Sequence, residues 1–168
     1  MSRQAIAAAA LALLLAGCAS YGTGGLQSGQ TADEVAARMG APTGRYTLPD
    51  GGTRLEYARG PLGKHTYMVD LDAQGRVRGW QQVLTEARLQ QGIQPGMPVD
   101  QLLREFGRPA EKRSGGRQGG EVWSYRYDAW GCFWWQVSVT GSGPDAQVRD
   151  AGPNTDPMCD TGNDSKPS

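Results

Sequence analysis

One segment of this chain occurs twice. The string LQSGQTADEVAARMGAP at residues 26–42 returns sixty-seven positions later as IQPGMPVDQLLREFGRP at residues 93–109. The positions that control backbone geometry are the same in both copies: Gly29 and Gly96, Gly40 and Gly107, and Pro42 and Pro109. Chance rarely produces such a match at one fixed offset. The chain is therefore a tandem repeat, and both copies are expected to form the same structural unit.

Each copy begins with a pattern typical of a short helix. Thr31 and Glu34 have the spacing of a capping box in the first copy. In the second copy Pro98 stands where the start of a helix tolerates proline. Gly40 and Gly107 then end the two helices, each with a proline two residues further on.

Three strands are predicted after each helix, because apolar residues alternate with polar ones between glycine-rich turns. They cover 54–58, 66–71 and 77–83 in the first copy and 121–127, 133–140 and 147–151 in the second. The predicted fold class is α+β: two tandem repeats, each made of short helices followed by a three-stranded antiparallel meander.

The N-terminus indicates export and lipidation. Residues 5–16 form an unbroken apolar run after Arg3. At about 1.5 Å per residue in a helix, this run is too short to cross a hydrocarbon core of about 30 Å. It is typical of a signal peptide. The following L-A-G-C string ends at Cys18 and resembles the bacterial lipobox, in which the cysteine is acylated and becomes the first mature residue. Ala19, rather than aspartate, follows it, which by resemblance to other bacterial lipoproteins favours the outer membrane. The alternative is an ordinary secretory signal with a chance cysteine.

Five segments follow from these signals: a signal peptide at 1–17, a lipidated tether at 18–25, the repeats at 26–86 and 87–159, and a disordered tail at 160–168. The full chain carries 17 basic and 17 acidic residues, and removal of Arg3 with the signal peptide leaves a net charge of about minus one. This balance gives no indication of nucleic acid or of an anionic membrane surface as a partner.

The three cysteines divide into one lipid site and one candidate disulfide. If Cys18 takes lipid, Cys132 and Cys159 remain as a pair in an oxidising compartment. The predicted strand at 133–140 runs away from Cys132, and the antiparallel strand at 147–151 returns towards it. The disulfide is therefore geometrically plausible and would stabilise the fold by about 3 to 4 kcal/mol. The alternative is two unpaired thiols.

The sequence contains no convincing catalytic or metal-binding pattern. His65 is the only histidine, and no nucleophile and base pair stands out. Residues 70–75 imitate the start of a calcium loop, but the twelfth position is Gln81 instead of glutamate. The glycines at 115–120 have no following lysine of a phosphate loop. The prediction is a protein that is not an enzyme, with no metal and no cofactor.

An aromatic run at residues 125–135 is the candidate binding surface. If Trp135 points to the core with Phe133, alternation along a strand sends Trp134 to the opposite face, and Trp130 lies near a loop tip. Exposed aromatics beside an arginine, here Arg126, are typical of protein-binding hot spots. Arg126, Trp130 and Trp134 are therefore the predicted contact residues. The alternative is that the other repeat or the tail covers this face.

The second copy also resembles a known family. G-M-P-x-D-Q-L-L-x-x-F-G-R-P at 96–109, VLTEARLQQGI at 83–93, and W-x-Y at Trp123 and Tyr125 resemble the SmpA/OmlA domain of the BamE family, small lipoproteins of outer-membrane β-barrel assembly. Two such domains in tandem resemble the architecture of β-lactamase-inhibitor proteins. The resemblance implies a helix-plus-sheet fold and an envelope location.

Taken with the lipobox, the resemblance predicts a lipid-anchored lipoprotein on the periplasmic face of the outer membrane. The expected function is binding of another envelope protein in outer-membrane assembly or maintenance, with the β-barrel assembly machinery as a candidate partner. The alternative is a lipoprotein inhibitor of a periplasmic or secreted hydrolase.

Overall fold

The structure is a computed structural model that describes residues 22–60, 63–115 and 120–159, except for the side chain of Cys159. The signal peptide, Cys18, part of the tether and residues 160–168 lie outside these ranges, so what was predicted for them remains a prediction. Among the described helices, none is long and apolar enough to cross a membrane.

The fold is α+β, with two four-stranded antiparallel sheets whose strands follow one another in chain order. The first unit contains α2 (Ala32–Met39), β1 (Gly44–Thr47), β2 (Thr53–Arg59), β3 (His65–Leu71) and β4 (Val77–Gln82). The second contains α3 (Glu86–Gly92), α4 (Val99–Phe106), β5 (Glu111–Ser114), β6 (Glu121–Arg126), β7 (Phe133–Thr140) and β8 (Gln147–Thr155), with short turns η3 (Gly143–Asp145) and η4 (Pro157–Cys159).

The expectation of three strands per sheet is wrong, because each sheet has a further strand, β1 or β5, directly after its helix. Both extra strands are four residues long, lie at a sheet edge and bury none of their residues fully. Such short, half-exposed strands lack the run of alternating apolar residues by which a strand is recognised. The other six strands occupy the predicted positions, and β8 extends further than expected.

The two units repeat the same backbone geometry. Gly40 after α2 and Gly107 after α4 have the same positive φ of 79°. The amide of Gly29 donates to Val77 O at 2.8 Å, and the amide of Gly96 donates to Val148 O at the same distance. The capping box of Thr31 and Glu34 is present at the start of α2. The glycines of the sequence repeat therefore mark equivalent turns.

Each unit buries one face of its sheet under its own helices. In the first unit Val35 and Met39 of α2 pack on β2, β3 and β4. In the second unit Leu102 and Phe106 of α4, with Leu89 of α3, pack on β6, β7 and β8. The two units thus have separate cores, and each is a helix layer on a sheet.

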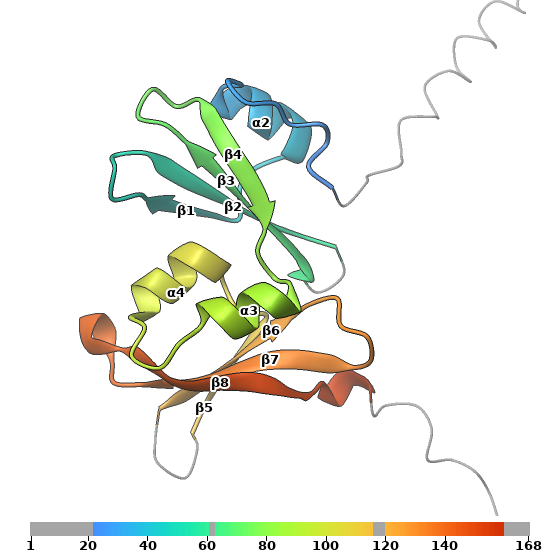
Figure 1. Ribbon diagram of the computed structural model, residues 1–168, viewed down its shortest axis with the longest axis vertical. Helices are drawn as coiled ribbons and strands as arrows, with labels where there is room; N and C mark the ends of the chain where they lie inside the picture. Colours follow the sequence, from blue (N-terminus) through green and yellow to red (C-terminus); the bar gives the residue numbers. More distant parts are fainter. Residues whose placement is uncertain (1–21, 61–62, 116–119, 160–168) are drawn as a thin grey trace, which may run out of the picture.

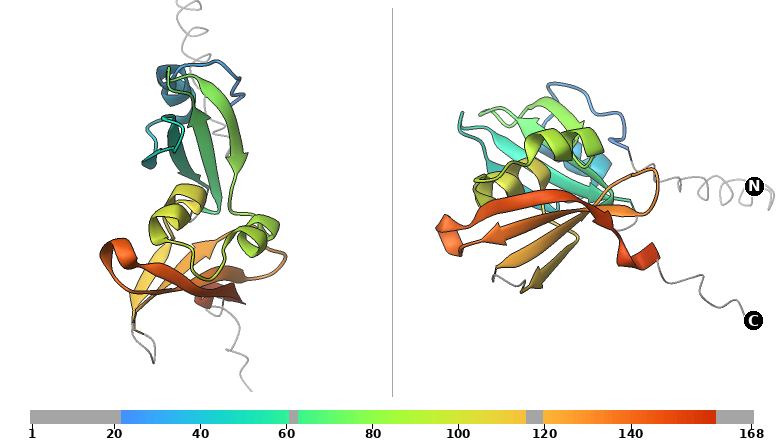
Figure 2. Two further views of the ribbon diagram at one scale, coloured as in Figure 1. Left: turned by 60° about the vertical axis from the view of Figure 1, so that its left-hand side comes forward. Right: turned by 60° about the horizontal axis from the view of Figure 1, so that its bottom comes forward.

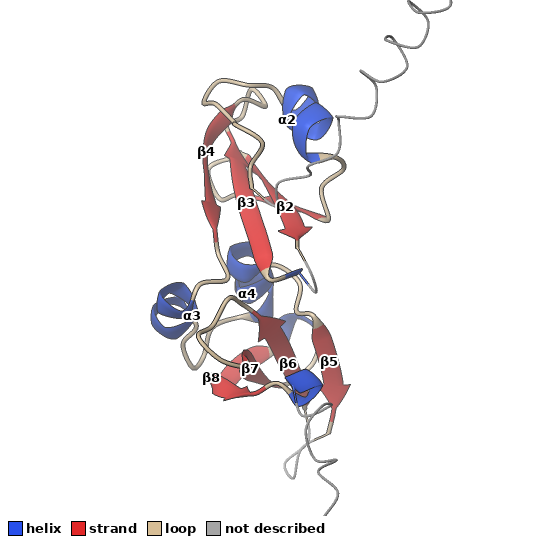
Figure 3. Ribbon diagram, turned by 90° about the vertical axis from the view of Figure 1, so that its right-hand side faces the viewer, coloured by secondary structure: helices blue, strands red, loops and turns tan. Residues whose placement is uncertain are grey.

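The units stack in one direction, so that the second unit lies against the free face of the first sheet (Figures 1 and 3). Met68 points away from α2 and belongs to the core of the second unit. Arg54, on the same face, donates to Arg104 O of α4 at 3.2 Å. The order of layers is α2, first sheet, α3 and α4, second sheet.

A buried carboxylate lies at the seam between the units. Glu56 of β2 is only 1% exposed. Its Oε1 accepts a hydrogen bond from Thr43 Oγ1 at 3.1 Å, and its Oε2 accepts one from the Tyr46 hydroxyl at 2.5 Å. Gly107 approaches so closely that a Cβ on it would lie 2.9 Å from Glu56 Cδ. The carbonyl of Gly107 also accepts a hydrogen bond from the Tyr125 hydroxyl at 3.1 Å.

Alanine substitutions at the equivalent glycines Gly40 and Gly107 distinguish the effect of backbone strain from the effect of packing at the seam. Alanine at either position is strained by the positive φ, at a cost of about 1 to 3 kcal/mol. At Gly40 the new Cβ meets nothing within 4 Å, whereas at Gly107 it clashes with Glu56. We expect Gly107→Ala to lower the free energy of unfolding by about 1 to 2 kcal/mol more than Gly40→Ala, measured by urea titration. Equal losses would show that the seam is looser than described.

Candidate functional site

The three residues predicted to bind a partner do not form one exposed surface. Trp130, in the loop between β6 and β7, is fully exposed. Trp134 of β7 is only 2% exposed, and Arg126 of β6 is also buried. The expectation of an exposed Trp134 is therefore wrong, although strand alternation placed it correctly on the face opposite Trp135, which packs in the core.

Arginines and the turn after β8 account for this burial. The guanidinium groups of Arg113 and Arg126 lie 5.3 Å and 5.1 Å from the centroid of the Trp134 ring. Arg126 Nε and NH2 donate to the two carboxylate oxygens of Asp156 at 2.6 Å and 3.2 Å. The hydrogen bond from Arg126 holds the pKa of Asp156 below its usual value. Arg126 is thus engaged within the fold, and sequence alternation could not reveal this pairing across thirty residues.

Cys132 is part of a disulfide. The amide of Asp156 donates to Cys132 O at 3.1 Å, which brings the segment leading into η4 beside Cys132. The side chain of Cys159 lies outside the description, so its pairing with Cys132 remains a prediction. The disulfide and this hydrogen bond hold the loop that carries Trp130.

His65 and the turn at residues 70–75 take part in contacts within the fold. His65 Nε2 lies 3.1 Å from Asp128 Oδ2, at the ends of the two sheets. Asp72 Oδ1 accepts hydrogen bonds from the amides of Gln74 and Arg76 at 2.9 Å and 2.8 Å, as in a polar hairpin turn. Within the described ranges, no group of three or more His, Cys, Asp or Glu side chains could hold a metal ion.

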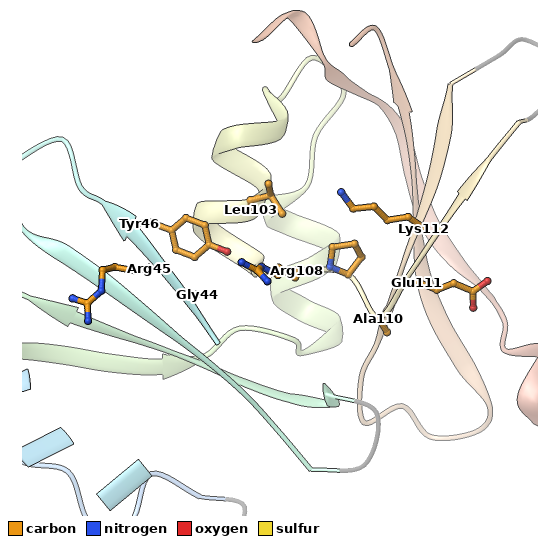
Figure 4. Close-up of a pocket in the computed structure, with 9 residues that line it drawn as sticks. Gly44, Arg45, Tyr46, Leu103, Arg108, Ala110, Glu111 and Lys112 are labelled. Carbon is orange, nitrogen blue, oxygen red and sulfur yellow. The ribbon is translucent and has the colours of Figure 1, made fainter. Parts of the chain in front are cut away.

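A groove of about 460 Å³ lies between the two units (Figure 4). It lies between edge strands β1 and β5, with the end of α4 as its floor. The residues that line it are Gly44, Arg45, Tyr46, Leu103, Arg108, Pro109, Ala110, Glu111 and Lys112. We call this hollow the edge-strand groove. Its volume is in the range of binding sites for small molecules and peptide side chains.

Two cationic groups face the edge-strand groove. Lys112 Nζ lies 3.6 Å from the centroid of the Trp123 ring, which holds the ammonium group on the inner side of β5. Arg108 follows α4 and lies beside the hydroxyl of Tyr46 (Figure 4). In the described part of the chain, neither cation forms an ion pair with a carboxylate.

Glu111 and Tyr46, which also line the groove, are engaged with other residues. Glu111 alternates to the other side of β5 and pairs with Arg113, Nε to Oε1, at 2.5 Å. Burial, followed by the hydrogen bond to Glu56, raises the pKa of Tyr46, so its hydroxyl remains a neutral donor at physiological pH. Arg45 extends away from the groove (Figure 4). The groove therefore presents the cationic groups of Arg108 and Lys112, with the buried carboxylate of Glu56 behind the Tyr46 hydroxyl that Arg108 contacts.

The strands that border the groove have open edges. β1 pairs only with β2, and β5 pairs only with β6, among the residues described. An edge strand presents unpaired N–H and C=O groups to which an extended chain can hydrogen-bond. The basic string GRPAEKR at 107–113 was the one available signal for this site. It could not be interpreted because β5 itself was not predicted.

Comparisons with known proteins leave the family open. No family model matches the sequence, and no curated protein matches it. A solved structure with partial similarity is a cysteine-rich secretory protein from Staphylococcus aureus, at 12% sequence identity and a TM-score of 0.27. The match covers 77% of this chain and 44% of that chain, so the present chain spans less than half of that protein. This similarity is too low to support an argument about fold or function.

The two tryptophans Trp130 and Trp134 should respond differently to truncation. Trp134→Ala is expected to lower the free energy of unfolding by about 3 to 5 kcal/mol, because a large buried ring leaves a cavity. Trp130→Ala should change it by no more than about 0.5 kcal/mol, since the ring is exposed. Urea denaturation of both variants measures this. A stable Trp134→Ala protein would contradict the burial of that ring.

Proposed function

We propose that this chain is a non-enzymatic, lipid-anchored envelope protein that binds an extended acidic segment of another envelope protein in the edge-strand groove. The observation that carries the proposal is the pair of cations, Arg108 and Lys112, without carboxylate partners beside the open edge of β5. Acylation of Cys18 supplies the anchor, and several acyl chains hold a protein on a bilayer almost permanently.

Strand addition to β5 gives such a segment both affinity and orientation. Main-chain hydrogen bonds to an open edge are independent of the partner's sequence, and side chains that alternate along the added strand supply the selectivity. Carboxylates of the partner would reach Arg108 and Lys112, while an apolar side chain would contact Leu103 and Pro109. Complementary charge of this kind mainly increases the association rate and the specificity.

The resemblance to the SmpA/OmlA domain of the BamE family supports the envelope role. A helix followed by an antiparallel sheet occurs twice, and the second copy carries the more specific string at 96–109. We propose that the partner acts in outer-membrane assembly or maintenance, at the periplasmic face. If the captured partner is instead a hydrolase whose activity falls on binding, the chain is an inhibitor.

A photo-crosslinking amino acid in place of Lys112 tests the proposal in cells. We expect an adduct with one envelope protein, and we expect the crosslinked peptide to be extended and rich in Asp or Glu. The same amino acid in place of Asp150, an exposed residue of β8, should give no such adduct.

Two charge reversals show whether the groove causes the adduct. Arg108→Glu should weaken capture at least tenfold, equivalent to about 1.4 kcal/mol. Arg149→Glu is the matched control, because Arg149 is an exposed arginine of β8 that does not line the groove. An adduct that survives Arg108→Glu, or that forms through a peptide without carboxylates, would refute the proposed binding mode.

A further inference from the structure

The exposed large apolar side chains of the second unit gather at one end of its sheet. Trp130 is fully exposed, Phe133 at the start of β7 is 44% exposed, and Met158 in η4 is 53% exposed. Trp130 and Phe133 also border a shallow hollow of about 200 Å³ together with Tyr127, Ala129, Glu86 and Pro153. Trp130 and Phe133 do not line the edge-strand groove, so the proposed function does not explain why their rings are exposed.

The loop that carries them is held in place. Cys132 is disulfide-bonded, and its carbonyl accepts a hydrogen bond from the Asp156 amide at 3.1 Å. Gly131 has a positive φ of 108°, which permits the sharp turn after Trp130. A loop fixed in this way presents Trp130 with little loss of conformational freedom on binding.

The N-terminal end of the described chain leaves the fold on the same side as this loop. Gly24 O accepts a hydrogen bond from Arg38 at the end of α2, and Met39 O accepts one from Arg59 at the end of β2. The end of β2 pairs with the start of β3, where His65 contacts Asp128 in the Trp130 loop. These contacts connect the N-terminal end of the described chain with the Trp130 loop. Figures 1 and 2 show the N-terminal exit, the β6–β7 loop and η4 on one side, whereas β1 and β5 lie farther to the left in Figure 1.

The short tether then limits how far this side can lie from the bilayer. Cys18 precedes Gly22, the first described residue, by four positions. An extended chain covers at most about 3.6 Å per residue, so the two residues are separated by no more than about 14 Å. This step rests on the acylation of Cys18 in the proposed function. If Cys18 is at the membrane surface, the end of α2 and the nearby hairpin ends lie close to the headgroups.

We propose that Trp130 and Phe133 form a second contact with the bilayer, at the headgroup level, on the side of the protein from which the tether emerges. Tryptophan favours this level because its ring is apolar and its N–H is polar. Two of the acidic groups there are engaged within the fold: Asp128 Oδ2 lies 3.1 Å from His65 Nε2, and Asp156 pairs with Arg126. The contact rests on the aromatic rings, so a zwitterionic bilayer is sufficient for it. It would fix the orientation of the protein and direct the edge-strand groove away from the surface.

Quenching of tryptophan fluorescence by brominated lipids tests this contact. The mature protein, purified from membranes, is reconstituted into phosphatidylcholine vesicles whose acyl chains carry bromine near the headgroup. We expect bromine-dependent quenching in the unmodified protein and the loss of most of it in Trp130→Ala. Trp80→Ala is the matched control, because Trp80 is partly exposed in the middle of β4, and it should keep the quenching.

The intact mass of each preparation separates the two proposals. An acylated protein whose quenching does not change in Trp130→Ala would overturn the second contact and leave the anchor standing. A mass without acyl chains would remove the anchor in the proposed function, and with it the premise of the second contact. Loss of quenching in Trp80→Ala but not in Trp130→Ala would place the bilayer at a different face and overturn the inference as well.

Discussion

The buried carboxylate of Glu56 is the interaction on which the arrangement of the two units depends. A charged group removed from water is costly unless hydrogen bonds satisfy it, and here the hydroxyls of Thr43 and Tyr46 do so. The equivalent position in the second sheet is Ser124, since Thr43 N and Ala110 N donate to the carbonyls of Glu56 and Ser124 in the same way. The acidic residue therefore occurs in the first sheet, on which the second unit packs, and a serine takes its place in the second sheet.

The proposed functional surfaces follow from this stacking. The edge-strand groove exists because the second unit packs on the first sheet and brings β5 near β1. Its positive charge comes from Arg108 and Lys112, which follow α4 closely in the chain and are placed by it. The tether-side contact is a second consequence, because stacking aligns the ends of the two sheets, as the contact between His65 and Asp128 shows. The proposed lipid anchor on one side and the proposed binding groove elsewhere would suit the envelope role proposed above.

Much of the fold could be predicted from the sequence, because the repeat preserves the residues that determine backbone geometry. Gly40 and Gly107 end equivalent helices, and six strands lie where alternation placed them. The edge strands could not be predicted, since four residues with none fully buried lack a run of alternating apolar residues. The candidate site was missed for the same reason. Alternation correctly predicted on which face of the sheet Trp134 lies. The burial of its ring, however, depends on the distant pair of Arg126 and Asp156, which no local sequence pattern encodes.

The seam at Glu56 joins the two units into one body, and native-state hydrogen exchange tests this claim most directly. If the claim holds, the slowest amides of β3 and β7 exchange with the same free energy of opening, and Glu56→Ala lowers both values by the same amount. Amides of β3 that exchange with a lower free energy than those of β7, and that alone respond to Glu56→Ala, would contradict it. The two repeats would then be independent units, and the edge-strand groove would lack a fixed wall.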